Sequence, residues 1–190
     1  MAMAEHVCPW WMGPLLASSL RRIMDDPRRI LAPHVTEGMT VLEPGPGMGF
    51  FTLELARMVG PRGRVIAVDI QPRMLEGLAR RAGRAGISQR IECRLGKGIS
   101  LGVGDLAGSV DFVLAYAVVH ELPDASVFFQ EAAHALRAGG RLLLAEPSGP
   151  VDENLFAAEL AAAHAAGLVM KETPSVSRGV AALLQKGDRP

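Results

Sequence analysis

One stretch decides the fold: residues 40–56 read TVLEPGPGMGFFTLELA. Its apolar start, with Val41 and Leu42, is typical of a buried parallel strand. After the glycines, apolar side chains recur at helical spacing at Phe51 and Leu55. Between strand and helix the backbone must turn sharply and leave room for a ligand. Glycine has no Cβ atom and permits both, so the stretch predicts a strand, a glycine-rich turn and a helix.

The spacing of the glycines separates two kinds of nucleotide-binding turn. The dinucleotide pattern is G-x-G-x-x-G, and its third glycine would fall where this chain has Phe50. Here the glycines alternate at positions 45, 47 and 49, and Glu43 lies two residues before the first of them. A tight turn that binds nothing is the alternative, but three alternating glycines lose chain entropy on folding with no local gain.

An acid followed by alternating glycines resembles the first signature of the class I S-adenosylmethionine (SAM) dependent methyltransferases. The resemblance covers about residues 35–186. It implies SAM as the cofactor and S-adenosylhomocysteine as the product, with Glu43 at the amino-acid end of SAM. The cofactor-binding residues that it implies are Glu43, Gly45, Pro46, Gly47, Met48, Gly49, Asp69, Ile70, Gly98, Ile99, Ala115 and Tyr116.

From Thr40 onward, strand and helix patterns alternate, which predicts a parallel sheet with helices on both faces. Further strands are expected at 64–69, 91–95, 110–116 and 141–146, and helices at about 72–85, 125–136 and 152–166. Two last strands, 169–176 and 180–185, are close enough for a hairpin with one antiparallel strand. The expected fold class is therefore α/β, a doubly wound, mostly parallel seven-stranded sheet that resembles the class I methyltransferase sheet.

Asp69 ends the second predicted strand, twenty residues after Gly49. An acid near this spacing accepts hydrogen bonds from ribose hydroxyls in nucleotide-binding folds. The alternative role is a helix N-cap, and it is weaker because Gln71 lies closer to Pro72, where the helix is expected to begin. The resemblance places Ile70 against the adenine.

The loop after the third predicted strand departs from the family pattern. Family members often have Gly-Asp there, with the Asp facing the adenine amino group, whereas this chain has Gly96-Lys97-Gly98. Lys97 cannot accept a hydrogen bond. Adenine recognition is therefore expected from the backbone of Gly98 and Ile99, or from Ser100 or water.

The end of the fourth predicted strand carries the candidate catalytic residues. The segment 115–124 resembles the fourth signature of small-molecule methyltransferases, where a histidine often precedes Leu-Pro-Asp. Ligands of open α/β sheets bind outside the carboxyl ends of the strands, so Tyr116 and His120 are expected near the transferred methyl group. His120 is the best candidate for a general base. The alternative is a structural histidine, because methyl transfer often needs no base.

The first 34 residues lie outside the alternating pattern and hold both tryptophans, Trp10 and Trp11. We predict a helical cover segment at 1–34 and a SAM-binding domain at 35–190. The cover is either a lid over the cofactor and substrate pocket or an apolar plug on the side of the sheet. Five apolar or small residues, Leu15, Leu16, Ser19, Leu20 and Ile23, predict one helix face within it.

Composition narrows the partners of the protein. The 190 residues are 49% hydrophobic and 21% charged with zero net charge, so no global field favours nucleic acid or an anionic membrane. Two cysteines, Cys8 and Cys93, form no metal spacing or disulfide framework, which favours a reducing cytoplasm. No signal peptide is expected. The five histidines are scattered, and no metal site is expected.

These observations together predict a SAM-dependent methyltransferase with a small-molecule acceptor. The fourth strand lacks the Asn/Asp-Pro-Pro-aromatic tetrad that marks methylation at amino groups of nucleobases or proteins, and the chain lacks the cysteine set of arsenic methyltransferases. Two alternatives stay open: a SAM-binding protein without turnover that regulates or docks to a partner, and a nicotinamide-dependent oxidoreductase. The sequence predicts neither the identity of the acceptor nor the oligomeric state.

Overall fold

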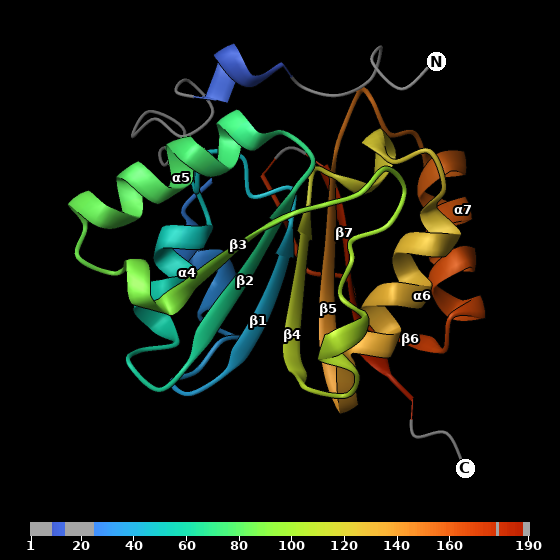
Figure 1. The fold of residues 1–190 in the computed structure, drawn as a ribbon. Helices are drawn as coiled ribbons and strands as arrows, with labels where there is room; N and C mark the ends of the chain where they lie inside the picture. The colour runs from blue at the N-terminus through green and yellow to red at the C-terminus, as the bar shows by residue number, and fades with distance from the viewer. Residues whose placement is uncertain (1–8, 14–24, 178, 188–190) are drawn as a thin grey trace. The chain divides into compact units, whose positions relative to one another are not determined.

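The computed structural model of the protein describes residues 9–13, 25–177 and 179–187. Seven strands in this part of the chain form one sheet in the order β3-β2-β1-β4-β5-β7-β6 (Figure 1). Their bounds are β1 Thr40–Pro44, β2 Arg64–Asp69, β3 Ile91–Leu95, β4 Val110–Tyr116, β5 Leu136–Pro147, β6 Leu168–Glu172 and β7 Gly179–Lys186. The chain divides into two compact units, residues 1–96 and 97–190.

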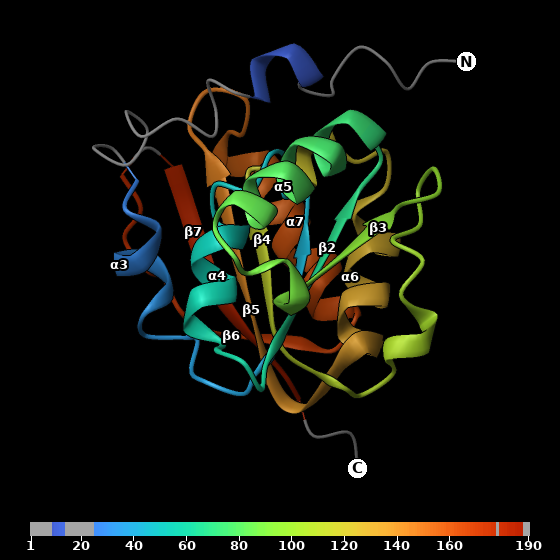
Figure 2. The same ribbon diagram turned by 60° about the vertical axis from the view of Figure 1, so that its left-hand side comes forward.

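The first unit holds three parallel strands and the helices that connect them. Its helical elements are η1 Trp10–Met12, α3 Pro27–Leu31, α4 Thr52–Met58, α5 Pro72–Arg84 and η2 Ser88–Arg90. β1 pairs with β2, and β2 pairs with β3, in parallel registers that align Val41 with Val65 and Val65 with Ile91. α4 packs against β2 and against α3, as Figure 2 shows from a second side.

Local signals place the helix starts of this unit where the sequence predicts them. Asp26 caps α3 by accepting a hydrogen bond from the Arg28 backbone N–H at 3.0 Å, and Pro27 fills the first helical position. α5 begins at Pro72 with Gln71 as its N-cap. The predicted helix face at Leu15 to Ile23 and the residues around it lie outside the described residues.

The second unit contains β4, β5 and a terminal hairpin, with helices η3 Gly104–Leu106, η4 Val119–Glu121, α6 Ala125–Ala135 and α7 Glu153–Ala165. Asp124 caps α6 and Asp152 caps α7, each through a backbone N–H bond of 2.8 Å to its carboxylate. β4 and β5 are parallel, whereas β7 runs antiparallel to both β5 and β6. The predicted fold class is confirmed.

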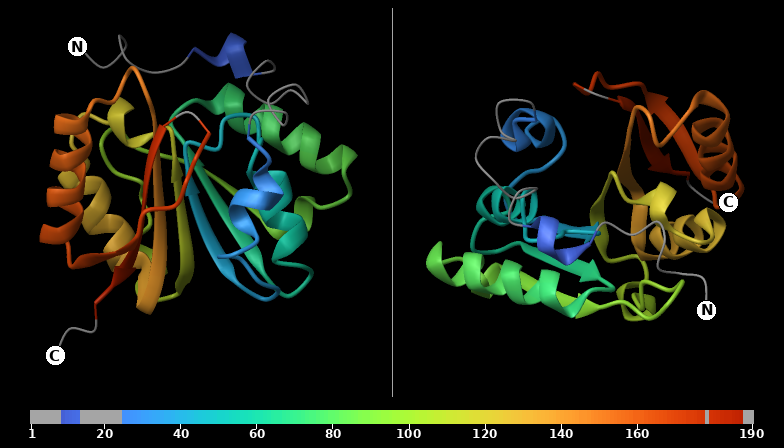
Figure 3. Two further views of the ribbon diagram at one scale, coloured as in Figure 1. Left: turned by 180° about the vertical axis from the view of Figure 1, so that it is seen from behind. Right: turned by 90° about the horizontal axis from the view of Figure 1, so that it is seen from above.

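The hairpin and its neighbour differ from the prediction in their bounds. β6 ends at Glu172 and not at residue 176, because Pro174 has no N–H to give to a strand ladder. β5 begins at Leu136, directly after α6, with a register shift against β4. The view from behind in Figure 3 shows β7 beside β5. No helix within the described residues is long and apolar enough to cross a membrane.

Candidate functional site

The glycine-rich turn of the first unit follows β1 directly. Glycine is required at positions 47 and 49 of this turn for different structural reasons. Gly47 and Gly49 have φ angles of 53° and 85°, in the left-handed region that favours glycine. A Cβ atom on Gly49 would lie 2.4 Å from Cδ1 of Leu78, so this glycine lets α5 pack against the loop. A Cβ atom on Gly47 would meet nothing within 4 Å, so this glycine leaves an open approach to the backbone.

Several backbone bonds hold the turn in place. The Gly45 N–H donates to the Val68 carbonyl of β2 at 2.9 Å, and the Gly49 N–H donates to the Pro46 carbonyl at 2.9 Å. The guanidinium of Arg81 on α5 donates to the Met48 carbonyl. Contacts with β2 and α5 therefore preorganise the turn.

Glu43 lies at the end of β1 with 3% of its surface exposed. Burial raises the pKa of its carboxyl from 4.5 to about 8, the nearby Thr52 hydroxyl lowers it, and the charge of Asp69 raises it. Within the described residues, Glu43 Oε2 and Thr52 Oγ1 have no hydrogen-bond partner of normal geometry. A buried carboxyl oxygen without a partner of normal geometry is complementary to a ligand that brings a cation or several N–H donors.

Asp69 ends β2 and is 8% exposed. Burial raises the pKa of its carboxyl to about 6, and the backbone N–H groups of Gln71, Gly47 and Ile70 lower it. The Gln71 bond is 2.8 Å long. Gln71, not Asp69, is the N-cap of α5. Asp69 therefore ties the glycine-rich turn to the start of α5, beside Ile70, whose side chain is 41% exposed.

The short helix η1 rests on the same turn. A Cβ atom on Gly13 or on Gly77 would lie 2.8 Å from the Met48 side chain, so Met48 packs against both glycines. The guanidinium carbon of Arg73 lies 4.7 Å from the Trp10 ring centroid, a cation–π contact. Figure 1 shows η1 beside the first turn of α5. Trp10 and Trp11 are 44% and 64% exposed, so neither is buried as an apolar plug would be.

In the second unit, the loop after β3 forms a tight backbone turn. Lys97 and Ser100 exchange two backbone hydrogen bonds of 3.0 and 3.1 Å. The Ser100 hydroxyl donates to Glu131 at 2.7 Å and accepts from the Gly102 N–H at 3.0 Å. The Ser100 hydroxyl is therefore occupied by hydrogen bonds to Glu131 and Gly102, whereas Gly98 and Ile99 at the tip of the loop are exposed.

The segment after β4 is strained. Ala117 has a φ of 54° and is the only residue other than glycine with positive φ in the described part of the chain. This conformation costs an alanine about 1–2 kcal/mol. The Ala117 N–H donates to the Ala145 carbonyl at 2.7 Å, which holds the strained residue in place. Ala115 before it is fully buried, and Tyr116 is half-buried at the strand end.

Behind this segment lies a cluster of His120, Glu146 and Glu159. Glu146, at the end of β5, accepts the Val119 N–H through Oε1 at 2.8 Å and contacts His120 Nδ1 through Oε2. Glu159 of α7 is 2% exposed, and neither of its carboxyl oxygens has a hydrogen-bond partner in the described chain. Burial raises its pKa to about 7, the charge of Glu146 raises it further, and His120 lowers it. Figure 1 shows η4 at the upper ends of β4 and β5, next to α7.

Comparison with known proteins decides the family. Residues 35–185 match the sequence model of a family described as a methyltransferase domain. The chain belongs to this family. It is a class I SAM-dependent methyltransferase domain, with the sheet order and antiparallel β7 expected of one.

Individual relatives agree with this assignment. An arsenite methyltransferase from Halobacterium salinarum is 37% identical over 109 residues, which are 57% of this chain and 27% of the relative. A ribosomal protein L11 methyltransferase from Pelotomaculum thermopropionicum is 34% identical over 156 residues, 80% of this chain and 46% of the relative. The chain thus spans less than half of these curated relatives.

A solved structure confirms the fold of the methyltransferase domain. The crystal structure of a SAM-dependent methyltransferase from Aquifex aeolicus superimposes with a TM-score of 0.85. The match covers 95% of this chain and 100% of that chain, at 21% sequence identity.

Within each unit of the methyltransferase domain, the structure brings predicted site residues together. Asp69 accepts a hydrogen bond from the Gly47 N–H and interacts electrostatically with Glu43, so these three residues lie together in the first unit. In the second unit, Tyr116 is the last residue of β4 and His120 lies in η4 just after it. Sequence reasoning did not group Glu146 and Glu159 with His120. The signal for Glu146 was present, because it ends a strand in an acid as Glu43 and Asp69 do.

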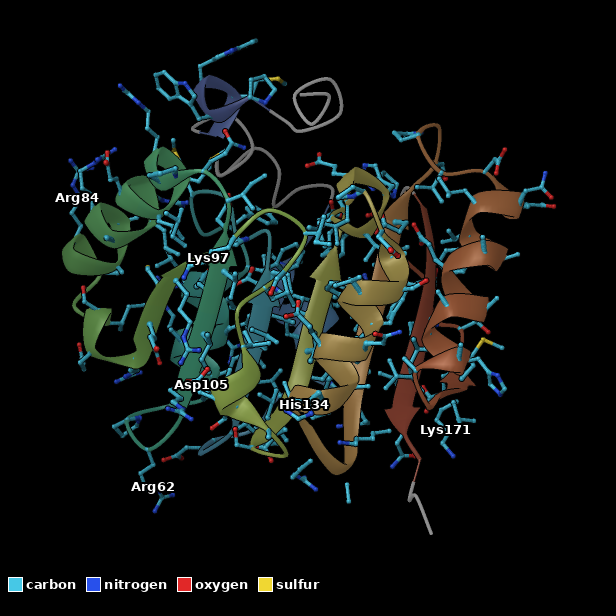
Figure 4. The ribbon with its side chains drawn as sticks, turned by 45° about the vertical axis from the view of Figure 1, so that its right-hand side comes forward. Arg62, Arg84, Lys97, Asp105, His134 and Lys171 are labelled. Carbon is cyan, nitrogen blue, oxygen red and sulfur yellow. The ribbon has the colours of Figure 1, made fainter. Side chains whose placement is uncertain are left out.

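Two further kinds of site to consider in the described residues are a metal centre and a surface hollow. Among the described residues, no group of three His, Cys, Asp or Glu side chains is arranged to hold a metal ion. A hollow of about 300 Å³ in the second unit is lined by Val103, Gly104, Gln130, Glu131 and His134. No predicted site residue lines it; Figure 4 labels His134, which is exposed on α6.

Proposed function

We propose that the protein transfers a methyl group from SAM to a small-molecule acceptor. The observation that carries the proposal is the trio of Glu43, Gly47 and Asp69 in a chain of this family. SAM brings an ammonium group, a ribose diol and a backbone-like amino-acid end. Glu43 is a buried carboxyl whose Oε2 has no hydrogen-bond partner of normal geometry in the described residues. Gly47 leaves an open approach to the backbone, and Asp69 is an acceptor at the end of β2.

Each residue has a proposed role toward the cofactor. Glu43 holds the ammonium group in its ionised form, and Asp69 accepts hydrogen bonds from the ribose hydroxyls. Ile70, whose side chain is exposed beside Asp69, gives an apolar wall to the adenine. Gly98 and Ile99 offer backbone groups to the adenine edge, since Ser100 is committed to Glu131. The backbone of 45–49 lies along the amino-acid end.

The bound cofactor supplies an activated methyl group on a sulfonium. The protein contributes mainly alignment and a water-poor surrounding. Tyr116 and His120, at the carboxyl end of β4, are proposed to face the acceptor. Trp10 and Trp11 are proposed to act as a lid within the cover segment 1–34, because both rings are exposed and Gly13, at the end of the same short helix, lies against Met48 of the glycine-rich turn.

The acceptor is proposed to be a small molecule in a cytoplasmic setting. The net charge of zero gives no general attraction to nucleic acid. The relatives with the names nocamycin O-methyltransferase and demethylmenaquinone methyltransferase point the same way. A SAM-binding protein without turnover is the alternative function, and the exposed tryptophans would then face a partner protein.

Calorimetry with SAM, S-adenosylhomocysteine and NAD tests the proposal. We expect both SAM and its product to bind and NAD not to bind. Binding of NAD without SAM would contradict the cofactor assignment. A metabolite screen with labelled SAM then separates an enzyme from a non-catalytic binder, because only an enzyme releases S-adenosylhomocysteine in step with a labelled product.

A further inference from the structure

The His120–Glu146 contact fixes the orientation of the imidazole ring. Glu146 uses both oxygens, one for the Val119 N–H and one for Nδ1. Because an ionised carboxylate only accepts hydrogen bonds, Nδ1 of the neutral ring carries the proton and Nε2 keeps its lone pair. The His120 side chain is 16% exposed and that of Glu146 is 0% exposed. The ring therefore presents its basic nitrogen on the side away from Glu146.

Glu159 adds a second carboxyl to this pair from a different element. Its oxygens have no hydrogen-bond partner in the described residues, and burial raises its pKa to about 7, so the carboxyl is charged in only part of the molecules at neutral pH. The charged groups that act on His120 are Glu146 of β5, Glu121 of η4 and Glu159 of α7, and each raises the pKa of the imidazole. Burial acts in the opposite direction.

We infer that His120 is the general base of the reaction, that Glu146 orients it, and that Glu159 is a positioning residue that strengthens it from α7. This arrangement follows the logic of a nucleophile-activating dyad, in which a buried carboxylate holds the histidine tautomer. The inference rests on the proposed methyl transfer. It also narrows the acceptor to a molecule whose nucleophilic atom carries a proton, a hydroxyl or an ammonium group.

The chemical step balances with these residues alone. The O–H or N–H bond of the acceptor breaks, its proton goes to Nε2, and the freed electron pair bonds to the methyl carbon. The carbon–sulfur bond of the sulfonium breaks, and its pair stays on sulfur as a neutral thioether. The imidazolium then returns its proton to solvent. A nucleophile without a proton would give His120 nothing to accept.

The test is an NMR titration of the histidine rings in the full chain without cofactor. We expect neutral His120 to carry its proton on Nδ1 and to titrate above its ordinary pKa of 6.5. In Glu146→Gln, the pKa of His120 should fall by about 1–2 pH units, which corresponds to the free energy of a charge-assisted hydrogen bond. In Glu159→Gln it should fall by a smaller amount. His134 and His164, both exposed, serve as internal references.

A matched control separates a local effect from a general loss of charge. Glu153→Gln removes an exposed carboxylate from the same helix, α7, and should leave the pKa of His120 unchanged. An Nε2–H tautomer in the wild-type protein would overturn the inference without any variant. If the pKa of His120 is the same in Glu159→Gln as in the wild type, Glu159 has no part in the inferred arrangement.

Turnover then tests the base itself. His120→Asn keeps a donor for Glu146 but has no basic nitrogen. We expect its SAM affinity to stay within about twofold of the wild type and its kcat to fall by about 10²–10⁴-fold. An acceptor found by the labelled-SAM screen that has no proton on its nucleophilic atom would overturn the acceptor class. Failure of the wild type to bind SAM would refute the proposed function instead, and the tautomer measurement would still decide the dyad.

Discussion

Glu43 gives the sharpest prediction, because the same carboxyl is expected to be neutral in the cofactor-free protein and charged when SAM is bound. Its pKa rises from 4.5 to about 8 through burial, so it is protonated at neutral pH. The unfolded chain loses this proton near pH 4.5, whereas the folded chain keeps it until about pH 8. The folded state therefore binds more protons between these values, and its stability falls as the pH rises through that window.

The magnitude follows from the pKa. Each pH unit in the window costs about 1.4 kcal/mol, so the whole rise corresponds to at most about 5 kcal/mol. Between pH 6 and pH 8, above the pKa of about 6 of Asp69, the wild type should lose about 2 kcal/mol through Glu43, because the loss levels off as the pH nears the folded pKa. Glu43→Gln mimics the protonated carboxyl and should not show this loss. Groups that do not interact with Glu43 titrate alike in both proteins and cancel in the difference.

Urea unfolding at fixed temperature across pH 5–9 measures the free energy of unfolding in both proteins. Glu37→Gln is the control, because it removes an exposed carboxylate of the same unit. Calorimetry at pH 7 in two buffers of different ionisation enthalpy counts the protons released on SAM binding. We expect close to one proton from the wild type and almost none from Glu43→Gln, with SAM affinity about 10- to 100-fold lower in the variant. Parallel stability curves, or no proton release by the wild type, would refute the reasoning.

Four further predictions test the site. Asp69→Asn should weaken SAM binding by about 1.5–3 kcal/mol with little change in melting temperature. Asp69→Ala should also lower the melting temperature, because it removes the acceptor of the Gln71 N–H. Equal SAM affinities of the wild type and Asp69→Asn, measured by calorimetry, would contradict the ribose role. Gly49→Ala should lower the melting temperature more than Gly47→Ala, since only the Gly49 Cβ atom meets Leu78, and Gly47→Ala should lose more SAM affinity. Ala117→Val should unfold at lower temperature than Ala117→Gly, because only glycine relieves the positive φ of 54°; equal melting temperatures would show that the segment relaxes. Deletion of residues 1–12 should leave a folded protein that binds SAM but transfers little methyl, and aggregation of the truncated protein would instead favour the plug over the lid.

Local patterns predicted most of the elements of the fold. The strands at 64–69, 91–95 and 110–116 have the bounds expected from their apolar runs. Helix α5 begins at Pro72 with Gln71 as its N-cap, as the sequence predicts, because capping depends only on residues within one turn. The terminal hairpin was predicted, but its strand β6 ends at Glu172 and not at residue 176. The end of a strand also depends on the partner strand that pairs with it.

The parts of the site that depend on distant residues were harder to predict. Glu43, Gly47 and Asp69 follow from spacing within one βαβ unit, so sequence reasoning could group them. Glu146 and Glu159 come from β5 and α7, and no local pattern joins them to His120. In the sequence, Glu159 is only one acid in an alanine-rich helix. The burial of its carboxyl without a hydrogen-bond partner in the described residues, on which its proposed role rests, becomes visible only when α7 is packed.

The sheet ends in one open edge strand in each unit, β3 in the first and β6 in the second. Such edges offer unpaired backbone groups to any passing strand, and a chain of this fold must keep other molecules from extending its ladder. β3 carries an Arg94–Glu92 ion pair of 2.7 Å beside its exposed Leu95. β6 exposes Val169 and Met170 but follows them with Lys171, labelled in Figure 4, where its register with β7 shifts. We therefore expect charge and irregularity at the two edges to oppose self-association into fibres, a safeguard independent of the chemistry of the protein.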